Sequence, residues 1–170
     1  MPIAETNRLL ISKITLKDAK FFLELVNSPH WLKYIGDRHL KTVKDSKTYL
    51  QNGTIKSYAD FGFGFYKLQY KKEGNKPIGV CGLIKRKQLD DVDIGFALLP
   101  EYEGKGFGHE ASVTILKLAK ETFNLKKVVA ITQPNNTSSI KLLEKLGLSF
   151  EKSVKPFEDG EELLLFAKTL

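Results

Sequence analysis

The sequence predicts an α/β fold made of a single domain, and three observations support this prediction. Strand-like apolar segments alternate along the chain with segments whose apolar residues recur at helical spacing. A glycine-rich turn joins one of these strands directly to a long helix. The chain has 170 residues, of which 42% are hydrophobic. This length and composition suffice for one sizeable core, so we expect one domain spanning residues 1–170.

The first half of the chain is expected to contain three strands and two helices. The apolar residues that follow Asp18 recur at helical spacing, and the segment Asn27–Pro29 ends this helix. In the second strand three phenylalanines share one face, while Gly62 and Gly64 leave the other face bare for another element or a ligand. The expected strands are 8–14, 61–66 and 77–86, the expected helices are 15–26 and 41–51, and residues 30–39 form an irregular aromatic stretch.

The second half is expected to contain four strands and two helices. Residues 127–133 are rich in β-branched and apolar side chains, which is typical of a strand in the middle of a sheet. Asn136 lies at the expected start of the last helix, and Gly147 ends it. The expected strands are 91–99, 127–133, 148–155 and 161–168, and the expected helices are 106–123 and 136–146.

The segment Glu103–Gly108, which we call the glycine turn, has the properties of an anion-binding site. Glycines at alternate positions let a ligand approach the backbone, because no Cβ stands in the way. The helix that begins here directs its unpaired N–H groups and the positive end of its dipole into the same space, which suits a phosphate. The segment lacks the Lys-Ser/Thr of a Walker loop, and His109 occupies the last glycine position of a dinucleotide fingerprint. Both of those motifs are therefore excluded.

The glycine turn resembles the Gln/Arg-x-x-Gly-x-Gly/Ala signature of the GNAT N-acetyltransferases. Downstream, Asn136–Ser139 and Leu143–Leu148 are similar to that family's Asn-x-x-Ser and Leu-Glu-Lys-x-Gly-Phe segments. The opening segment Glu5–Ile11 is similar to the start of the branch that acetylates ribosomal-protein N-termini. One departure concerns the chemistry: Leu143 stands where many members carry a tyrosine thought to protonate the departing thiolate.

The resemblance implies the acyl-CoA N-acyltransferase fold, which is a mixed, strongly bent sheet of about seven strands flanked by about four helices. It also implies an acetyl-CoA-dependent N-acetyltransferase that transfers the acetyl group to a primary amine by direct attack on the thioester. The N-terminal α-amine of a protein is the acceptor implied by the closest branch. Acetyl-CoA is the expected co-substrate, and no metal is expected.

For the cofactor, the resemblance implies contacts from the glycine turn, from the preceding strand and from the last helix. Backbone N–H groups of the turn would bind the pyrophosphate, and the edge of the strand would pair with the pantetheine arm. The implied cofactor-binding residues are Phe96, Ala97, Leu98, Leu99, Gly104, Lys105, Gly106, Phe107, Gly108, Asn136 and Ser139.

Three residues are candidates for moving protons. Asp93 matches the position of a family glutamate that works as a base, and the alternative for it is an exposed carboxylate or one paired with a lysine. Glu158, in the late turn, is a second candidate base by the same resemblance. Ser139 could donate a proton to the thiolate, or its role could be hydrogen bonding at the helix start.

The acceptor pocket is expected to contain aromatic side chains. In the family this pocket lies between the first two helices and the late turn, which makes Trp31, Tyr34 and Phe157 the candidates. Aromatic residues are more often part of a core, and this alternative applies to Trp31 above all.

Charge and cysteine content bear on partners and location. The 27 Lys and Arg residues exceed the 20 Asp and Glu residues and give a formal net charge of +7, which suits a lysine-rich surface or an anionic partner. No recognised nucleic-acid motif is present, which argues against RNA. Cys81 lies alone in an apolar strand, which indicates an inert buried thiol. A single cysteine and the lack of a signal peptide or membrane span lead us to expect a cytoplasmic protein.

Several functions remain open at this stage. The acceptor could be a small-molecule amine, such as a polyamine, an amino acid or an antibiotic. The chain could also be a non-catalytic acyl-CoA-binding module, or a basic RNA-associated domain, which would bind RNA with a steep salt dependence. The oligomeric state is open as well, a homodimer included.

Overall fold

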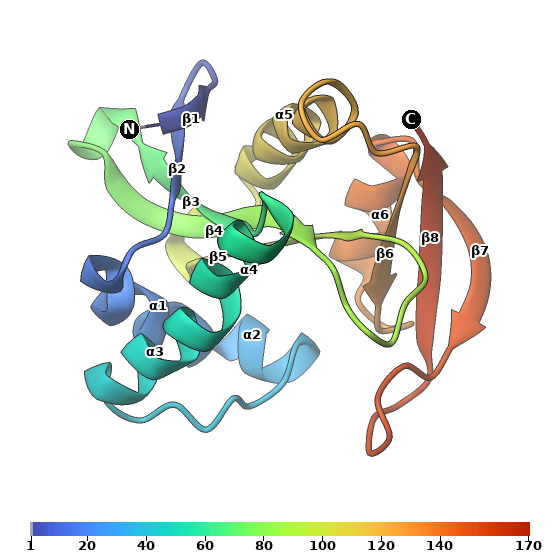
Figure 1. The fold of residues 1–170 in the computed structure, drawn as a ribbon, viewed down its shortest axis with the longest axis horizontal. Helices are drawn as coiled ribbons and strands as arrows, with labels where there is room; N and C mark the ends of the chain where they lie inside the picture. Colours follow the sequence, from blue (N-terminus) through green and yellow to red (C-terminus); the bar gives the residue numbers. More distant parts are fainter. Residues whose placement is uncertain (1) are drawn as a thin grey trace.

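The computed structural model describes residues 2–170, and these residues form one eight-stranded sheet flanked by helices (Figure 1). The strand order is β1-β2-β3-β4-β5-β6-β8-β7, and every neighbouring pair is antiparallel except β5 and β6. The strands are β1 (Pro2–Glu5), β2 (Leu9–Lys13), β3 (Phe65–Tyr70), β4 (Lys76–Ile84), β5 (Asp93–Leu98), β6 (Lys127–Thr132), β7 (Ser149–Val154) and β8 (Leu163–Thr169). The predicted mixed sheet with flanking helices is confirmed.

Six α-helices accompany the sheet within the described residues. They are α1 (Ala19–Val26), α2 (Pro29–Tyr34), α3 (Val43–Leu50), α4 (Lys56–Phe61), α5 (Phe107–Glu121) and α6 (Thr137–Lys145). A π-helical segment, Gln51–Ile55, joins α3 to α4. Figure 1 shows α3 and α4 in front of the sheet and α5 farther back. Within residues 2–170, no helix has the length and apolarity that a bilayer crossing requires.

The sheet divides between β5 and β6. These two parallel strands are paired at Asp93 and Val129, and the amide of Val129 donates a hydrogen bond to the carbonyl of Val92 at 3.0 Å. Beyond this point β5 keeps its pairing with β4, while β6 turns away with β8 and β7 (Figure 1). The edge of β5 that faces β6 therefore lacks a strand partner from Ile94 to Leu98.

The main core lies between β2–β5 and the helices on either side. Phe22 of α1, Tyr66 of β3 and Phe107 of α5 are among its largest fully buried side chains. Trp31 is 4% exposed and packs edge-on against Phe22, with the two ring centroids 6.1 Å apart. Trp31 therefore belongs to this core, which is the alternative considered for it from the sequence.

The sequence prediction was wrong for the segment 61–66. Instead of starting a strand, Phe61 ends α4, and Gly62 terminates that helix in the left-handed conformation at a φ of +82°. The strand begins only at Phe65, so the alternation of phenylalanines did not correspond to a strand face there. The prediction also missed β1, α2 and α4, because short segments carry too few apolar repeats to show a period.

The close approach of β3 and β4 requires a glycine at position 82. A Cβ on Gly82 would lie 2.1 Å from the carbonyl oxygen of Gly64 and 2.7 Å from the Cα of Phe65. Both of these contacts are backbone atoms, which cannot rotate away as a flexible side chain would.

We therefore predict that Gly82→Ala destabilises the protein by about 2–3 kcal/mol, because the two strands must separate. Thermal unfolding should show a midpoint lower by about 5–10 °C. The matched control is Gly53→Ala, where an added Cβ meets nothing within 4 Å and the midpoint should stay equal or rise slightly. Equal midpoints for the two variants would contradict this account of β3–β4 packing.

Candidate active site

A cavity of about 1060 Å³ runs along the free edge of β5. Its walls come from β5, from α2–α4 on one side, and from α6 and the β7–β8 connection on the other. One end reaches the glycine turn, and the other reaches Asp93 at the start of β5. Between these two ends lies β5, which is about 17 Å long because a strand rises about 3.3 Å per residue. Phe96, Ala97 and Leu98 line the stretch between them.

The glycine turn presents backbone to this cavity. Gly104 and Gly106 adopt the left-handed region, with φ of +71° and +83°, which residues with a Cβ rarely occupy. No side chain caps the N-terminus of α5, so the first N–H groups of this 15-residue helix lack the usual partner. Gly108 faces Leu142 of α6, where an added Cβ would meet the leucine at 3.2 Å. The turn is thus shaped and charged for a bound anion.

The turn is anchored to the N-terminal segment by Arg8. Its Nη1 donates to the carbonyl of Lys105 at 3.0 Å, and its Nε donates to Oε1 of Glu110 at 2.9 Å. The guanidinium also lies 4.1 Å from the ring centroid of Phe107. The carboxylate of Glu110 further accepts hydrogen bonds from the hydroxyl of Thr6 and from the amide of Arg8. These contacts connect the turn between β1 and β2 to the glycine turn and the start of α5, between residues 97 to 104 positions apart in the sequence.

This anchor also sets the ionisation of Glu110. Burial by itself would raise the pKa of the carboxyl group, but the hydrogen bonds from Thr6 and Arg8, together with the charge of Arg8, outweigh it. The pKa of Glu110 is consequently lower than its ordinary value. This role of Arg8 could not be predicted from Glu5–Ile11 alone, because the partners of Arg8 are distant in the chain.

At the other end of the cavity, Asp93 is buried and paired with an arginine. Only 2% of Asp93 is exposed, and its Oδ1 accepts a hydrogen bond from Nε of Arg86 at 3.0 Å. Burial raises the pKa of Asp93, while the charge and hydrogen bond of Arg86 act in the opposite direction and leave the pKa above its usual value. The alternative of a solvent-exposed or lysine-paired carboxylate is therefore wrong. The role of Arg86 was missed, since it looked like one of several surface cations.

The start of α6 lies beside the glycine turn. Asn136 is buried, and its side-chain oxygen accepts a hydrogen bond from the amide of Ser139 at 3.3 Å, so it caps the helix. Both residues line the cavity. Leu143, in the position where many GNAT members carry a tyrosine, is 1% exposed and packs in the core.

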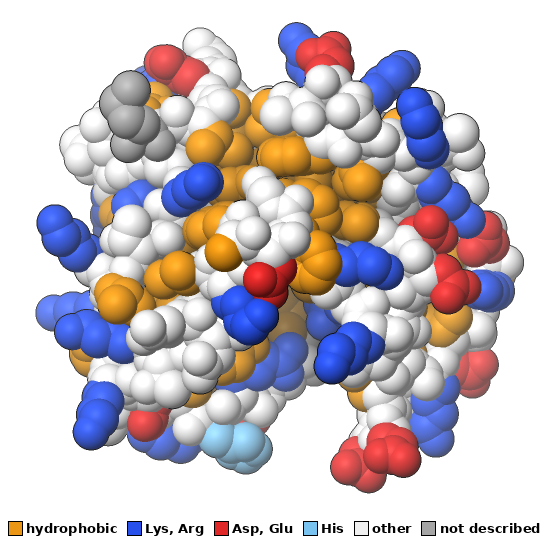
Figure 2. Space-filling model, in the orientation of Figure 1, with side chains coloured by type: hydrophobic (Ala, Val, Ile, Leu, Met, Phe, Trp, Pro, Cys, Tyr) orange, Lys and Arg blue, Asp and Glu red, His pale blue; other side chains and the backbone are white. Residues whose placement is uncertain are grey.

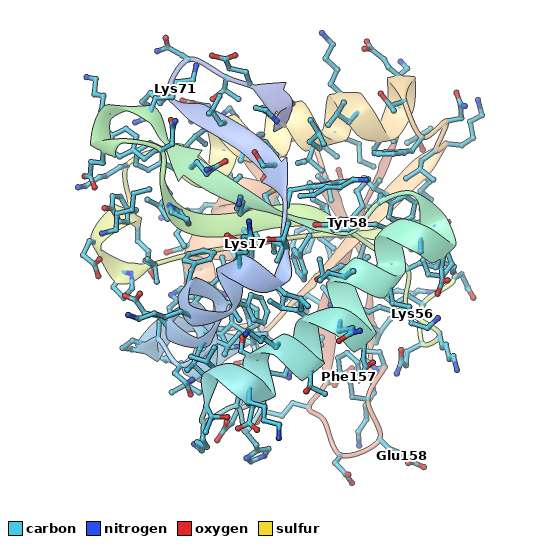
Figure 3. The ribbon with its side chains drawn as sticks, turned by 60° about the vertical axis from the view of Figure 1, so that its left-hand side comes forward. Lys17, Lys56, Tyr58, Lys71, Phe157 and Glu158 are labelled. Carbon is cyan, nitrogen blue, oxygen red and sulfur yellow. The ribbon has the colours of Figure 1, made fainter. Side chains whose placement is uncertain are left out.

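The three aromatic candidates for the acceptor pocket all line the cavity. Tyr34 packs against His30, with ring centroids 4.7 Å apart, and the guanidinium of Arg86 lies 5.7 Å from the ring centroid of Phe157. In Figure 3, Phe157 lies beneath α4 on the same side as Lys56, whereas Glu158 is at the tip of the β7–β8 connection. Glu158 is exposed and is not part of the cavity wall.

Three other predicted residues also lie outside the cavity wall, namely Leu99, Lys105 and Phe107. Leu99 and Phe107 are buried in the core, each 1% exposed, so their side chains serve packing. Lys105 is exposed. Cys81 is fully buried, and burial raises the pKa of its thiol to about 12, in agreement with an inert thiol. Among residues 2–170, no group of three or more His, Cys, Asp or Glu side chains is arranged to hold a metal ion.

Comparison with known proteins identifies the family that this fold and site define. Residues 8–149 match the model of the acetyltransferase (GNAT) domain, and the chain therefore belongs to this family of N-acetyltransferases. The chain is 28% identical over 161 residues to the uncharacterized N-acetyltransferase p20 of Bacillus licheniformis, a match that covers 94% of this chain and 89% of that protein.

Solved structures show the same fold. An acetyltransferase from Agrobacterium tumefaciens superposes with a TM-score of 0.84 at 23% identity, covering 100% of this chain and 95% of that one. RimL, a ribosomal L7/L12 α-N-protein acetyltransferase solved in complex with coenzyme A, superposes with a TM-score of 0.81 at 14% identity, covering 100% and 98%.

The lowered pKa of Glu110 makes its contribution to stability dependent on pH. This contribution is fully present above the unfolded value of 4.5 and is lost as the pH falls through the lower folded value. We predict that Glu110→Gln costs about 1–2 kcal/mol at pH 7 and much less near pH 3. Urea unfolding across this range measures the difference.

The matched control for this experiment is Glu121→Gln, at the exposed end of the same helix. Its effect on the free energy of unfolding should be small and should vary little with pH. A Glu110→Gln cost that is the same at pH 3 and pH 7 would contradict the proposed contribution of the Arg8 anchor.

Proposed function

We propose that this chain transfers an acetyl group from acetyl-CoA to the N-terminal α-amine of a protein or peptide. The observation that carries the proposal is the combination of an uncapped glycine turn with a free strand edge on one cavity. An anionic group bound at the turn would have its extended arm held along β5. The cavity continues to a buried carboxylate at the far end, where an amine can be received.

The turn fits the pyrophosphate of the coenzyme. Backbone N–H groups of Gly104–Gly108 would hold its oxygens, and a side chain at Gly106 would occupy space that Arg8 borders at 3.3 Å. Phe96–Leu98 would provide backbone partners for the pantetheine arm, and Asn136 would contact it from α6. When bound, acetyl-CoA supplies an activated acetyl thioester. Backbone N–H groups at the free edge of β5 can stabilise negative charge that develops on a carbonyl oxygen in the cavity.

The acceptor amine must be neutral in order to attack. An α-amine has a pKa of about 7.7–8.0 and is partly neutral at pH 7, whereas a lysine amine has a pKa of about 10.4. An α-amine therefore places the smaller demand on a base. Asp93 lies at the correct end of the cavity to accept the proton, and its raised pKa makes it a stronger base than an ordinary carboxylate.

The group that protonates the departing thiolate must differ from the usual tyrosine, because Leu143 is apolar and buried. Ser139 lines the cavity and is the hydroxyl candidate that the sequence singled out. A thiolate of pKa about 8.5 leaves without strict need of a donor, so this step makes a modest demand on the chain.

The resemblance of Glu5–Ile11 to the ribosomal-protein branch supports a protein acceptor over a small amine. The small-amine alternative keeps the same cofactor and the same chemistry. A non-catalytic acyl-CoA-binding module is the third alternative, and turnover separates it from the other two.

The first test is transfer to defined acceptors. With acetyl-CoA, the protein should acetylate a short peptide at its free α-amine and leave the same peptide unmodified when that amine is blocked, even if a lysine is present. Mass spectrometry identifies the product.

Gly106→Val should abolish acetyl-CoA binding, because valine is strained at a φ of +83° and fills the turn. Undiminished affinity by calorimetry would contradict the cofactor assignment.

The second test concerns the base. We predict that Asp93→Asn lowers kcat by about 100-fold or more and removes the acidic limb of the pH profile, because an amide cannot take the proton. The asparagine oxygen can still accept the hydrogen bond from Arg86, so the geometry of the pair is preserved. Unchanged kcat with an unchanged pH profile would show that Asp93 only orients Arg86.

A further inference from the structure

Arg86 stands out at the acceptor end of the cavity because part of its guanidinium is unused. In the described chain, its Nε donates to Asp93, while no acceptor is recorded for its two Nη atoms. The Asp93 contact and the nearby Phe157 ring hold the group in place, and 26% of the side chain remains accessible. Arg86 is part of the cavity wall, so its free Nη atoms belong to a side chain that lines the cavity.

The charges around Arg86 favour an anion as well. Outside the glycine turn and α6, four Lys or Arg side chains and two carboxylates line the cavity; they are Arg38, Lys56, Lys85, Arg86, Asp60 and Asp93. Both carboxylates are already engaged, Asp60 by Lys56 and Asp93 by Arg86. Arg38 and Lys85 have no carboxylate partner within 4.0 Å among residues 2–170, although Lys85 donates to two backbone carbonyls at 3.3 Å. This part of the cavity wall is left with an excess of positive charge.

Arg86 is too distant to serve the glycine turn. Arg86 contacts Asp93 at the start of β5, and the turn follows the other end of that strand, about 17 Å away at about 3.3 Å per residue. Figure 2 shows the face notched at its lower edge, between the part that holds α1–α3 in Figure 1 and the β7–β8 connection, with Lys and Arg side chains on both flanks. The acidic side chains at the tip of that connection point away from the notch.

A second donor in the cavity wall also lacks a partner. The indole Nε1–H of Trp31 is buried and has no hydrogen-bond acceptor in residues 2–170, and Trp31 is part of the cavity wall. A buried donor without an acceptor is destabilising, so a bound molecule that offers an acceptor atom to this N–H would be stabilised there. The cavity wall outside the glycine turn therefore has donors in excess and carboxylates that are already paired.

We propose that the acceptor carries an anionic group, a carboxylate or a phosphate, next to its reacting amine, and that the Nη atoms of Arg86 bind this group. The proposal rests on the proposed function and specifies its substrate class. The planar fork of a guanidinium matches two oxygens of a carboxylate or phosphate, and charge-assisted hydrogen bonds of this kind are strong. The same positive charge lowers the pKa of an approaching amine and so favours the neutral form that attacks.

The experiment compares two peptides that begin with the same serine and differ only in the second residue, aspartate or its neutral isostere asparagine. For the wild-type protein with acetyl-CoA, kcat/KM should be about 10-fold higher for the aspartate peptide, as expected for one charge-assisted contact. In Arg86→Gln this ratio should fall to about 1, mainly through a higher KM for the aspartate peptide. Arg86→Lys, which keeps the charge and loses the fork, should give an intermediate ratio.

The matched control is Lys87→Gln, which removes the same charge from an exposed neighbour outside the cavity wall. Its peptide ratio should equal that of the wild type. Calorimetric affinity for acetyl-CoA shows whether each variant is folded. Equal kcat/KM for the two peptides with the wild-type protein overturns the proposal without any variant, and an unchanged ratio in Arg86→Gln overturns the assignment to Arg86.

A parallel pair of small amines, phosphoethanolamine and ethanolamine, separates this proposal from the proposed function. Acetylation of both peptides at equal rates would support a protein acceptor and contradict the anionic specificity. Acetylation of neither peptide, with phosphoethanolamine strongly preferred over ethanolamine, would support the anionic specificity and contradict a protein acceptor. Transfer to none of the four acceptors would contradict both.

Discussion

The candidate site depends on the separation of β5 from β6. β5 is hydrogen-bonded to β4 along its whole length, but on its other edge the pairing with β6 is confined to Asp93 and Val129. Backbone groups without partners are costly when they are buried, so an open edge inside a sheet must face water or a ligand. The cavity satisfies this requirement by running along that edge. The break in the sheet therefore creates the surface on which an extended cofactor arm can pair.

Charge is arranged at the two ends of this edge, and each end has its own support. At the glycine turn, the helix dipole of α5 is combined with Arg8, which binds the carbonyl of Lys105 and is itself neutralised by Glu110. At the start of β5, Asp93 is the residue that pairs with β6, and its carboxylate binds the Arg86 guanidinium. The strand β5 lies between the glycine turn and Arg86. A cofactor bound at the turn and an acceptor bound at Arg86 would therefore meet along β5. The length of β5 thus sets the distance between the site for the anion and the site for the acceptor.

Much of this was predictable from local sequence, and the errors have identifiable causes. The helix expected at 106–123 and the strand expected at 77–86 agree with α5 and β4, because long periodic segments give a clear signal. The strand expected at 61–66 was wrong, since Gly62 ends a short helix in a left-handed conformation that apolar alternation cannot reveal. The Arg8 anchor was missed because its partners lie about 100 residues away, and Arg86 was missed because its partner belongs to the neighbouring strand.

The sequence alone determined the order of the longer strands and helices, the glycine turn and the resemblance to the GNAT family, because propensity, periodicity and motif spacing are local properties. The tertiary structure decided which candidates share one cavity: it brought Asp93, Ser139, Trp31, Tyr34 and Phe157 to the wall and left Glu158 at a loop tip. It also decided the ionisation of Asp93 and the availability of the Arg86 guanidinium. Burial and charge pairing depend on neighbours that only folding brings together, so no local pattern encodes them.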